Sequence, residues 1–146
     1  LQDIANLAGA RTPGLSERMG RLHFSPAQGF MKGFMDLVFS HQDRFYLLDW
    51  KSNYLGPTLE HYSPARTASA MAQGLYPLQY LLYTLALHRH LSLRIPDYRY
   101  ETHFGGVFYV FLRGVDPSKG PGWGVYSDRP DPELLRRLET TLLRVP

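Results

Sequence analysis

Two runs of strand-forming residues, separated by a short polar segment, constrain the fold of this chain more than any other feature. Phe30 to Phe39 and Arg44 to Lys51 are rich in aromatic and other β-favouring residues, and His41-Gln42-Asp43 lies between them. Two such runs joined by a short polar turn are typical of a β-hairpin. The sequence therefore predicts two antiparallel strands, with Gln42 and Asp43 at the centre of the turn.

The rest of the chain alternates segments of helical and strand character. Gly106 to Gly114 is a near-continuous apolar run of strand length, as expected for a central strand that is buried on both faces. The other predicted elements are a short strand at Arg21–Phe24, helices at Pro64–Gln73, Pro77–Leu91 and Asp131–Leu143, and a short strand at Gly124–Ser127. Interleaved helices and strands indicate an α/β fold, with a mixed central sheet that contains the hairpin and is flanked by helices.

Several residues mark where the predicted helices begin, end and pack. Ser63 and Pro64 have the residue types of an N-cap and a first helical position, and Gly74 is expected to end that helix. His88 and His90 are expected near the end of the second helix, where their charge would favour its C-terminal dipole. The apolar face of the last helix is expected to comprise Leu134, Leu135, Leu138 and Leu142.

Composition narrows the class of protein. The 146 residues are 44% hydrophobic and 20% charged, which favours a single globular domain over residues 1–146. The formal net charge of +3 permits a polyanionic partner without requiring one. The sequence contains no cysteine, so disulfides, cysteine-ligated metal centres and thiol catalysis within this chain are excluded. The sequence has neither a signal peptide nor an apolar run of about 18 residues, and we expect a cytoplasmic protein.

Three polar residues stand out on the predicted hairpin. With the turn centred on Gln42 and Asp43, Asp36 of the first strand faces Asp49 of the second, and Lys51 points to the same side as Asp49 because side chains alternate along a strand. Directly opposed like charges are destabilising unless something neutralises them, and a divalent cation would do so. The cluster is expected among apolar neighbours, namely Phe34, Val38, Phe45 and Leu47.

This set of residues matches the needs of phosphodiester hydrolysis. A hard cation such as Mg²⁺ is held by one or two carboxylates and completed by water and phosphate oxygens. A lysine beside it can orient the attacking water and stabilise developing charge. The alternative is an exposed polar face of the hairpin with an ordinary Asp–Lys ion pair, worth about 0.2–1 kcal/mol.

The residues around these three resemble the PD-(D/E)xK nucleases, and closely the C-terminal nuclease domain of RecB, the β subunit of exodeoxyribonuclease V. The resemblance covers most of positions 20 to 127 and is carried by four segments, Gly29–Phe39, Tyr46–Gly56, Leu78–Arg89 and His103–Val115. It implies a PD-(D/E)xK nuclease-like core in which the hairpin is the acidic, catalytic element.

The resemblance also implies roles for individual residues. Asp36 and Asp49 would be metal ligands, Lys51 the catalytic lysine, and the main-chain carbonyl of Trp50 a further ligand of the metal. Gln79 and Tyr83 match the Gln-x-x-x-Tyr motif of RecB-like nucleases. Because they are spaced i and i+4, they share one helical face and would brace the site or contact the DNA backbone. A partly buried helix face with satisfied polar tips is the alternative for these two residues.

One expected ligand has no counterpart in the sequence. RecB-type sites take a histidine from a helix well before the acidic hairpin, and none of the six histidines matches it: His23, His41, His61, His88, His90 and His103. The first residue is not methionine. We therefore expect the chain to be the C-terminal portion of a RecB-type nuclease domain that lacks its N-terminal helix, with activity in isolation in doubt.

The resemblance further implies a parent protein that is an ATP-driven helicase and a magnesium-dependent exodeoxyribonuclease. Such a parent would act on double-strand ends and single strands of DNA in repair and recombination, with RecC-like and RecD-like subunits as partners. Helicase motifs are not present in this sequence. Two alternatives remain: a non-catalytic module that keeps the nuclease fold to bind DNA or partner subunits, and a related nuclease with a cysteine-ligated cluster, which the lack of cysteine disfavours.

Overall fold

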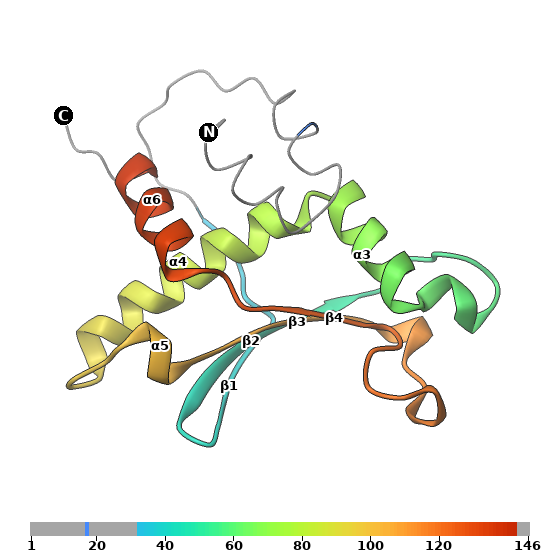
Figure 1. The fold of residues 1–146 in the computed structure, drawn as a ribbon, viewed down its shortest axis with the longest axis horizontal. Helices are drawn as coiled ribbons and strands as arrows, with labels where there is room; N and C mark the ends of the chain where they lie inside the picture. The colour runs from blue at the N-terminus through green and yellow to red at the C-terminus, as the bar shows by residue number, and fades with distance from the viewer. Residues whose placement is uncertain (1–16, 18–31, 143–146) are drawn as a thin grey trace.

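The computed structural model describes residue 17 and residues 32–142, and a four-stranded sheet organises the fold of this region (Figure 1). Its strands are β1 (Leu37–His41), β2 (Arg44–Lys51), β3 (Phe104–Phe111) and β4 (Val125–Asp128), arranged in that order. β2 and β3 are parallel, whereas the β1–β2 and β3–β4 pairs are antiparallel. The predicted mixed sheet of an α/β fold is therefore confirmed.

The hairpin of β1 and β2 has the predicted register. Leu37 pairs with Leu48 and His41 with Arg44, so that Gln42 and Asp43 form the turn, both with positive φ. Type I′ turns need positive φ at both central residues, and this is why a two-residue turn suits the twist of the strands. The predicted start of the first strand is wrong: β1 begins at Leu37, residues 32–36 are not in a strand, and Phe30 lies outside the described residues.

Two helices follow the hairpin and bring the chain back to the sheet. After a 3-10 turn (Leu59–Tyr62) come α3 (Pro64–Gln73) and α4 (Tyr76–Arg94). Ser63 occupies the N-cap position of α3, as predicted, but its side chain makes no capping hydrogen bond. The end of α3 at Gly74 is confirmed, whereas α4 continues beyond the predicted Leu91, so that His88 lies more than one turn before its end.

The third strand is central, as its apolar sequence predicts, and it is paired on both sides. It begins at Phe104, directly after the single-turn helix α5 (Tyr100–His103), which has too few residues to produce a recognisable pattern. The predicted end at Gly114 is wrong, because residues Leu112–Gly114 form a 3-10 turn. Another 3-10 turn (Pro117–Lys119) lies between β3 and β4.

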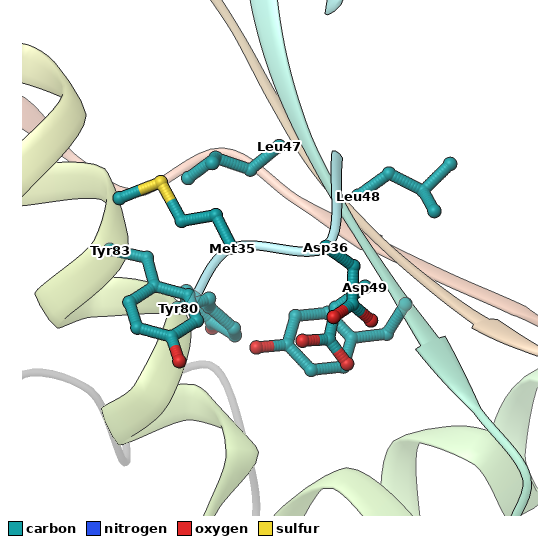
Figure 2. Close-up of a pocket in the computed structure, with 8 residues that line it drawn as sticks. Met35, Asp36, Leu47, Leu48, Asp49, Tyr80 and Tyr83 are labelled. Carbon is teal, nitrogen blue, oxygen red and sulfur yellow. The ribbon is translucent and has the colours of Figure 1, made fainter. Parts of the chain in front are cut away.

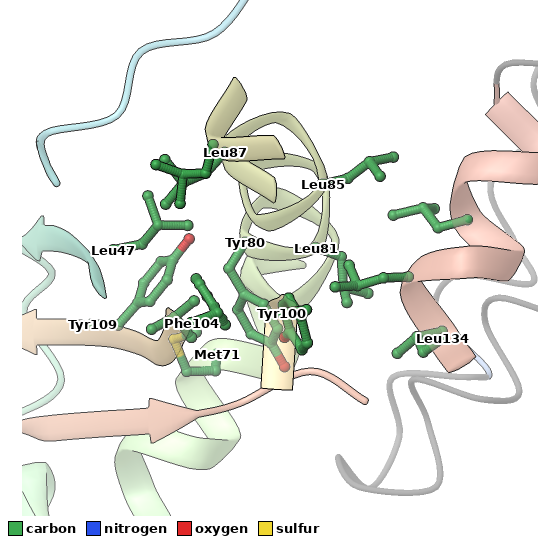
Figure 3. Packing of buried hydrophobic residues seen from close by; sticks show 14 of the residues in the cluster. Leu47, Met71, Tyr80, Leu81, Leu85, Leu87, Tyr100, Phe104, Tyr109 and Leu134 are labelled. Atoms are coloured by element: carbon green, nitrogen blue, oxygen red, sulfur yellow. The ribbon is translucent and has the colours of Figure 1, made fainter. Parts of the chain in front are cut away.

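The helix α4 has core contacts on two sides, one with α6 and one with the sheet. Figure 3 shows Leu81 and Leu85 pointing from α4 toward Leu134 of α6 (Pro132–Leu142), while Tyr80 lies toward the sheet, near Tyr109 of β3. Leu134, Leu135 and Leu138 of α6 are buried as predicted. Leu142, one turn after Leu138, is 39% exposed, so the predicted apolar face is not buried at that end of the helix.

Two remaining expectations concern the ends of the chain and its location. The predicted strand at Arg21–Phe24 and the last residues of the final helix, from 143 onward, lie outside the described residues. Among the residues that are described, no helix is long and apolar enough to cross a membrane.

Candidate active site

The hairpin brings Asp36 and Asp49 to one small pocket. Continuing the β1–β2 register by one residue beyond Leu37 and Leu48 places Asp36 opposite Asp49. Asp36 and Asp49 both line the same pocket, together with Met35, Leu47, Leu48, Tyr80, Tyr83 and Tyr109, and Figure 2 shows their carboxylates next to each other. The expected juxtaposition of the two acids is therefore present, although Asp36 lies in a bend just before β1.

Asp36 is tied to the neighbouring strand by its side chain. Its Oδ2 accepts a hydrogen bond from the main-chain N–H of Trp50 at 3.0 Å. This bond fixes the carboxylate beside Asp49 without using Trp50's indole, which lies on the opposite face of β2 and is 46% exposed. The predicted role of the Trp50 carbonyl as a ligand stays a prediction.

Lys51 shares a face of β2 with Asp49 and is ion-paired to it. Its Nζ lies 2.5 Å from Asp49 Oδ2, and the two residues are only 9% and 7% exposed. This rules out the alternative of an ordinary exposed ion pair, since a charge in such a position is held by neighbours rather than by water. The predicted apolar surroundings are only partly correct: Phe34 and Val38 are exposed, whereas Leu47 is buried.

Gln79 of α4 joins the lysine to two tyrosines. Its Oε1 accepts from Lys51 Nζ at 3.3 Å and from the Tyr109 hydroxyl at 3.0 Å, and its Nε2 donates to the Tyr83 hydroxyl at 3.4 Å. Gln79 and Tyr83 are therefore on one helical face beside the carboxylates, in a position to brace the site. A DNA contact by either residue stays a prediction.

Tyr109 is a residue of this site that the sequence analysis missed. It lies in β3 directly beside Asp49 in the parallel register and is almost completely buried. Burial, together with the charges of Asp49 and Asp36, raises the pKa of Tyr109 far above its usual value, so its hydroxyl stays protonated and donates to Gln79. A polar tip within the apolar run Gly106–Gly114 was the signal that could have identified it.

The donor set fits Mg²⁺. Two carboxylates on adjacent segments line one pocket, and hard oxygen ligands of this kind are what Mg²⁺ prefers, with water and phosphate oxygens completing its shell. Among residue 17 and residues 32–142, no group of three or more acidic, histidine or cysteine side chains is placed to hold a metal. No histidine in that stretch of the chain therefore joins the two acids, and His23 lies outside it.

Comparison with known proteins identifies relatives, although no family model matches the chain. RecBCD enzyme subunit RecB of Escherichia coli K12 is 52% identical over 118 residues, or 81% of this chain, and that of Haemophilus influenzae is 48% identical over the same share. RecBCD enzyme subunit RecB of Mycobacterium tuberculosis is 35% identical and aligns with 99% of this chain. The chain spans 10% of the first two relatives and 14% of the third. With 35–52% identity over most of its length, the chain belongs to the RecB family.

Proposed function

We propose that this domain hydrolyses DNA phosphodiester bonds in a Mg²⁺-dependent reaction, with Asp36, Asp49 and Lys51 at the catalytic centre. The observation that carries the proposal is the convergence of these three side chains. Two carboxylates line one pocket, and a buried lysine is paired with one of them. Asp49 and Lys51 are buried and Asp36 is exposed beside them, and a buried charged pair next to a further carboxylate is typical of a functional site.

In this proposal each residue has a definite task. Asp36 and Asp49 would hold a Mg²⁺ ion, which would supply Lewis acidity at the scissile phosphate. Lys51 donates from Nζ to the attacking water or to a phosphate oxygen and stabilises negative charge as it develops. Gln79 helps to hold Nζ beside Asp49, and its own position is fixed by Tyr109 and Tyr83.

The relatives suggest a larger setting for the domain. Their names describe RecB subunits of a RecBCD enzyme, and this chain corresponds to about a tenth of their length. We infer that the domain works within a helicase–nuclease of the exodeoxyribonuclease V type, in DNA double-strand break repair and recombination. RecC-like and RecD-like subunits would be its partners, and ATP-driven unwinding would reside in other regions of that protein.

Cleavage of linear DNA by the full-length protein tests the catalytic assignment. We would compare wild type with Asp49→Asn in the presence and absence of Mg²⁺. Asn preserves the size of the side chain but holds a cation far less well, so cleavage should fall by at least about 10³-fold, as expected for a group that acts in the transition state. DNA binding should persist.

A matched control is available within the same hairpin. Asp43→Asn makes the same chemical change at the exposed turn, where Asp43 has a φ of 59° that asparagine also tolerates. Asp43→Asn should cut DNA at the wild-type rate. Cleavage that survives Asp49→Asn would instead support a non-catalytic module that only binds DNA or partner subunits.

A further inference from the structure

The ammonium group of Lys51 lies in a wedge between two tyrosine rings. Its Nζ is 4.0 Å from the centroid of the Tyr76 ring and 4.8 Å from that of the Tyr109 ring. The two rings also pack on each other, with centroids 5.8 Å apart and planes tilted by 36°. Ring faces attract cations within about 6 Å, and more strongly when water is excluded. Lys51 is therefore held by aromatic faces as well as by Asp49 and Gln79.

The Tyr76 ring is itself held in place from three sides. Its hydroxyl accepts a hydrogen bond from Asn53 Nδ2 at 3.1 Å, and its ring packs against Tyr109. Gly74 leaves the space that the ring occupies, because a Cβ at that position would lie 2.5 Å from Tyr76 Cε2. Gly74 has a φ of −80°, which any residue adopts, so this clearance is what requires glycine there. Asn53, Tyr109 and Gly74 therefore all contribute to the position of the Tyr76 ring.

The two rings matter because, under the proposed function, Lys51 is not the only partner of Asp49. Under the proposed function, the same carboxylate that pairs with Lys51 also holds the cation. An ammonium has three N–H donors, of which Asp49 and Gln79 take one each. If Asp49 binds a cation instead of Lys51, Lys51 keeps its position only if other groups hold it. Two ring faces do so without occupying a donor, which leaves N–H groups available to water or phosphate.

We propose that Tyr76 and Tyr109 are positioning residues that form an aromatic cage for Lys51 and keep its ammonium directed at the pocket. The inference rests on the proposed function only for its consequence in catalysis. The cage itself is a property of the folded chain and can be measured without any DNA. Tyr76 is the better residue to change, because it is only partly buried, whereas Tyr109 belongs to the core.

The first test measures how well Lys51 is protected from an acylating reagent. The full-length protein is treated briefly with an N-hydroxysuccinimide ester, and modification of Lys51 and of the exposed Lys119 is quantified by peptide mass spectrometry. In wild type Lys51 should react far more slowly than Lys119. In Tyr76→Leu the rate at Lys51 should rise about tenfold, the equivalent of one strong cation–π contact, while Lys119 stays the same. Tyr76→Phe, which keeps the ring face, should retain most of the protection.

The second test measures cleavage with the same proteins. Tyr76→Leu should lower kcat about tenfold with little change in KM, because a positioning defect acts in the transition state rather than in DNA binding. Tyr76→Phe should recover most of this loss. Tyr98→Leu is the matched control, because Tyr98 is also partly buried and contacts His88 and His103 rather than Lys51. It should change neither kcat nor the protection of Lys51.

The outcomes separate this inference from the proposed function. Equal reactivity of Lys51 in wild type and Tyr76→Leu overturns the cage. If Tyr76→Phe is as defective as Tyr76→Leu, the contact is made through the hydroxyl and Asn53, and the cage is again wrong. If Lys51 is protected by the ring but no variant or wild type cuts DNA, the cage stands and the proposed function fails.

Discussion

The carboxylate of Asp36 serves as the hydrogen-bond partner of the Trp50 main-chain amide, at a distance of 3.0 Å. β1 begins one residue later, at Leu37. The side chain of Asp36 therefore makes the hydrogen bond to β2 just beyond the point where the strand pairing ends. A single carboxylate thus joins the edge of the sheet to the pocket that Asp49 also lines. One oxygen of Asp36 accepts this hydrogen bond, and under the proposed function the other would hold the cation.

This double task predicts that stability and activity will separate at Asp36. Asp36→Asn keeps an acceptor for Trp50 and also relieves repulsion from Asp49, so the free energy of unfolding should stay within about 1 kcal/mol of wild type. Asp36→Ala removes the acceptor and should lower it by about 1–2 kcal/mol. Both variants should lose Mg²⁺-dependent cleavage. Urea denaturation followed by tryptophan fluorescence, combined with a cleavage assay, checks both statements; activity in Asp36→Asn would exclude Asp36 as a ligand.

Removing the charge of Lys51 should be costly to the fold. Lys51→Met leaves the buried Asp49 without its ion-pair partner, and the free energy of unfolding should fall by about 3 kcal/mol. Millimolar Mg²⁺ should restore some of this loss, because a cation can neutralise the two carboxylates. Thermal unfolding with Mg²⁺ or with EDTA measures the difference. A variant as stable as wild type in EDTA would mean that Lys51 contributes no net ion-pair stability.

The bond between Gln79 and Tyr109 can be tested by removing one partner and then both. Gln79→Leu leaves the buried Tyr109 hydroxyl without its acceptor and should cost about 1–3 kcal/mol of unfolding free energy. Adding Tyr109→Phe to that variant should recover some of the loss, because no unpaired hydroxyl then remains. A denaturant series on the two single variants and the double variant gives the coupling energy. Strict additivity would show that the two side chains do not interact.

Gly124 should be far less tolerant of alanine than Gly120, although both have positive φ. A Cβ at Gly124 would lie 2.3 Å from a main-chain carbon of Gly114, whereas a Cβ at Gly120 meets nothing within 4 Å. Gly120→Ala should therefore cost only the strain of its backbone conformation, φ 95° and ψ 173°, about 1–3 kcal/mol. Gly124→Ala should cost at least about 2 kcal/mol more than Gly120→Ala, because main-chain atoms must also move. Similar melting temperatures for the two variants would contradict this difference.

His88 should make the domain less stable in mild acid. Burial, the largest cause, lowers the pKa of His88 below its usual value of 6.5, and Arg89 acts in the same direction, while Glu139 and Glu101 oppose it. The unfolded chain therefore binds a proton more readily than the folded chain, and stability falls as the pH drops through about 6.5 toward the lower folded pKa. His88→Gln should flatten this region of the stability profile. An unchanged slope between pH 7 and pH 5 would show that His88 does not contribute.

The environment of His88 is an example of what local sequence patterns could not predict. The residue was expected to favour the helix dipole as a charged group near a C-terminus, but α4 continues to Arg94 and packs His88 against Tyr98 and Tyr100. By contrast, the hairpin register and the placement of Asp36, Asp49 and Lys51 followed from turn geometry and the two-residue period of strands. Those are local rules, and the hairpin register that they predict is confirmed, although β1 begins later than predicted.

The surroundings of Lys51 could not be predicted in the same way. Gln79 was identified by a motif, but its hydrogen bond to Lys51 depends on how α4 lies over β2. Tyr109 is marked only by its hydroxyl within an apolar run, and Tyr76 directly precedes the predicted start of a helix at Pro77. Their convergence on one ammonium is a property of tertiary packing, for which a single sequence has no periodic signal.

The parallel pairing of β2 with β3 has a consequence for the order in which the chain folds. Trp50 and Asp36 are 14 positions apart, whereas Gln79 is 28 positions from Lys51 and 30 from Tyr109. Shorter loops close at a smaller entropic cost and, in general, earlier. We therefore expect the two acids to meet in the local hairpin before Gln79 reaches Lys51. Any repulsion between the two carboxylates would then act early in folding, and divalent cations that relieve it should accelerate refolding.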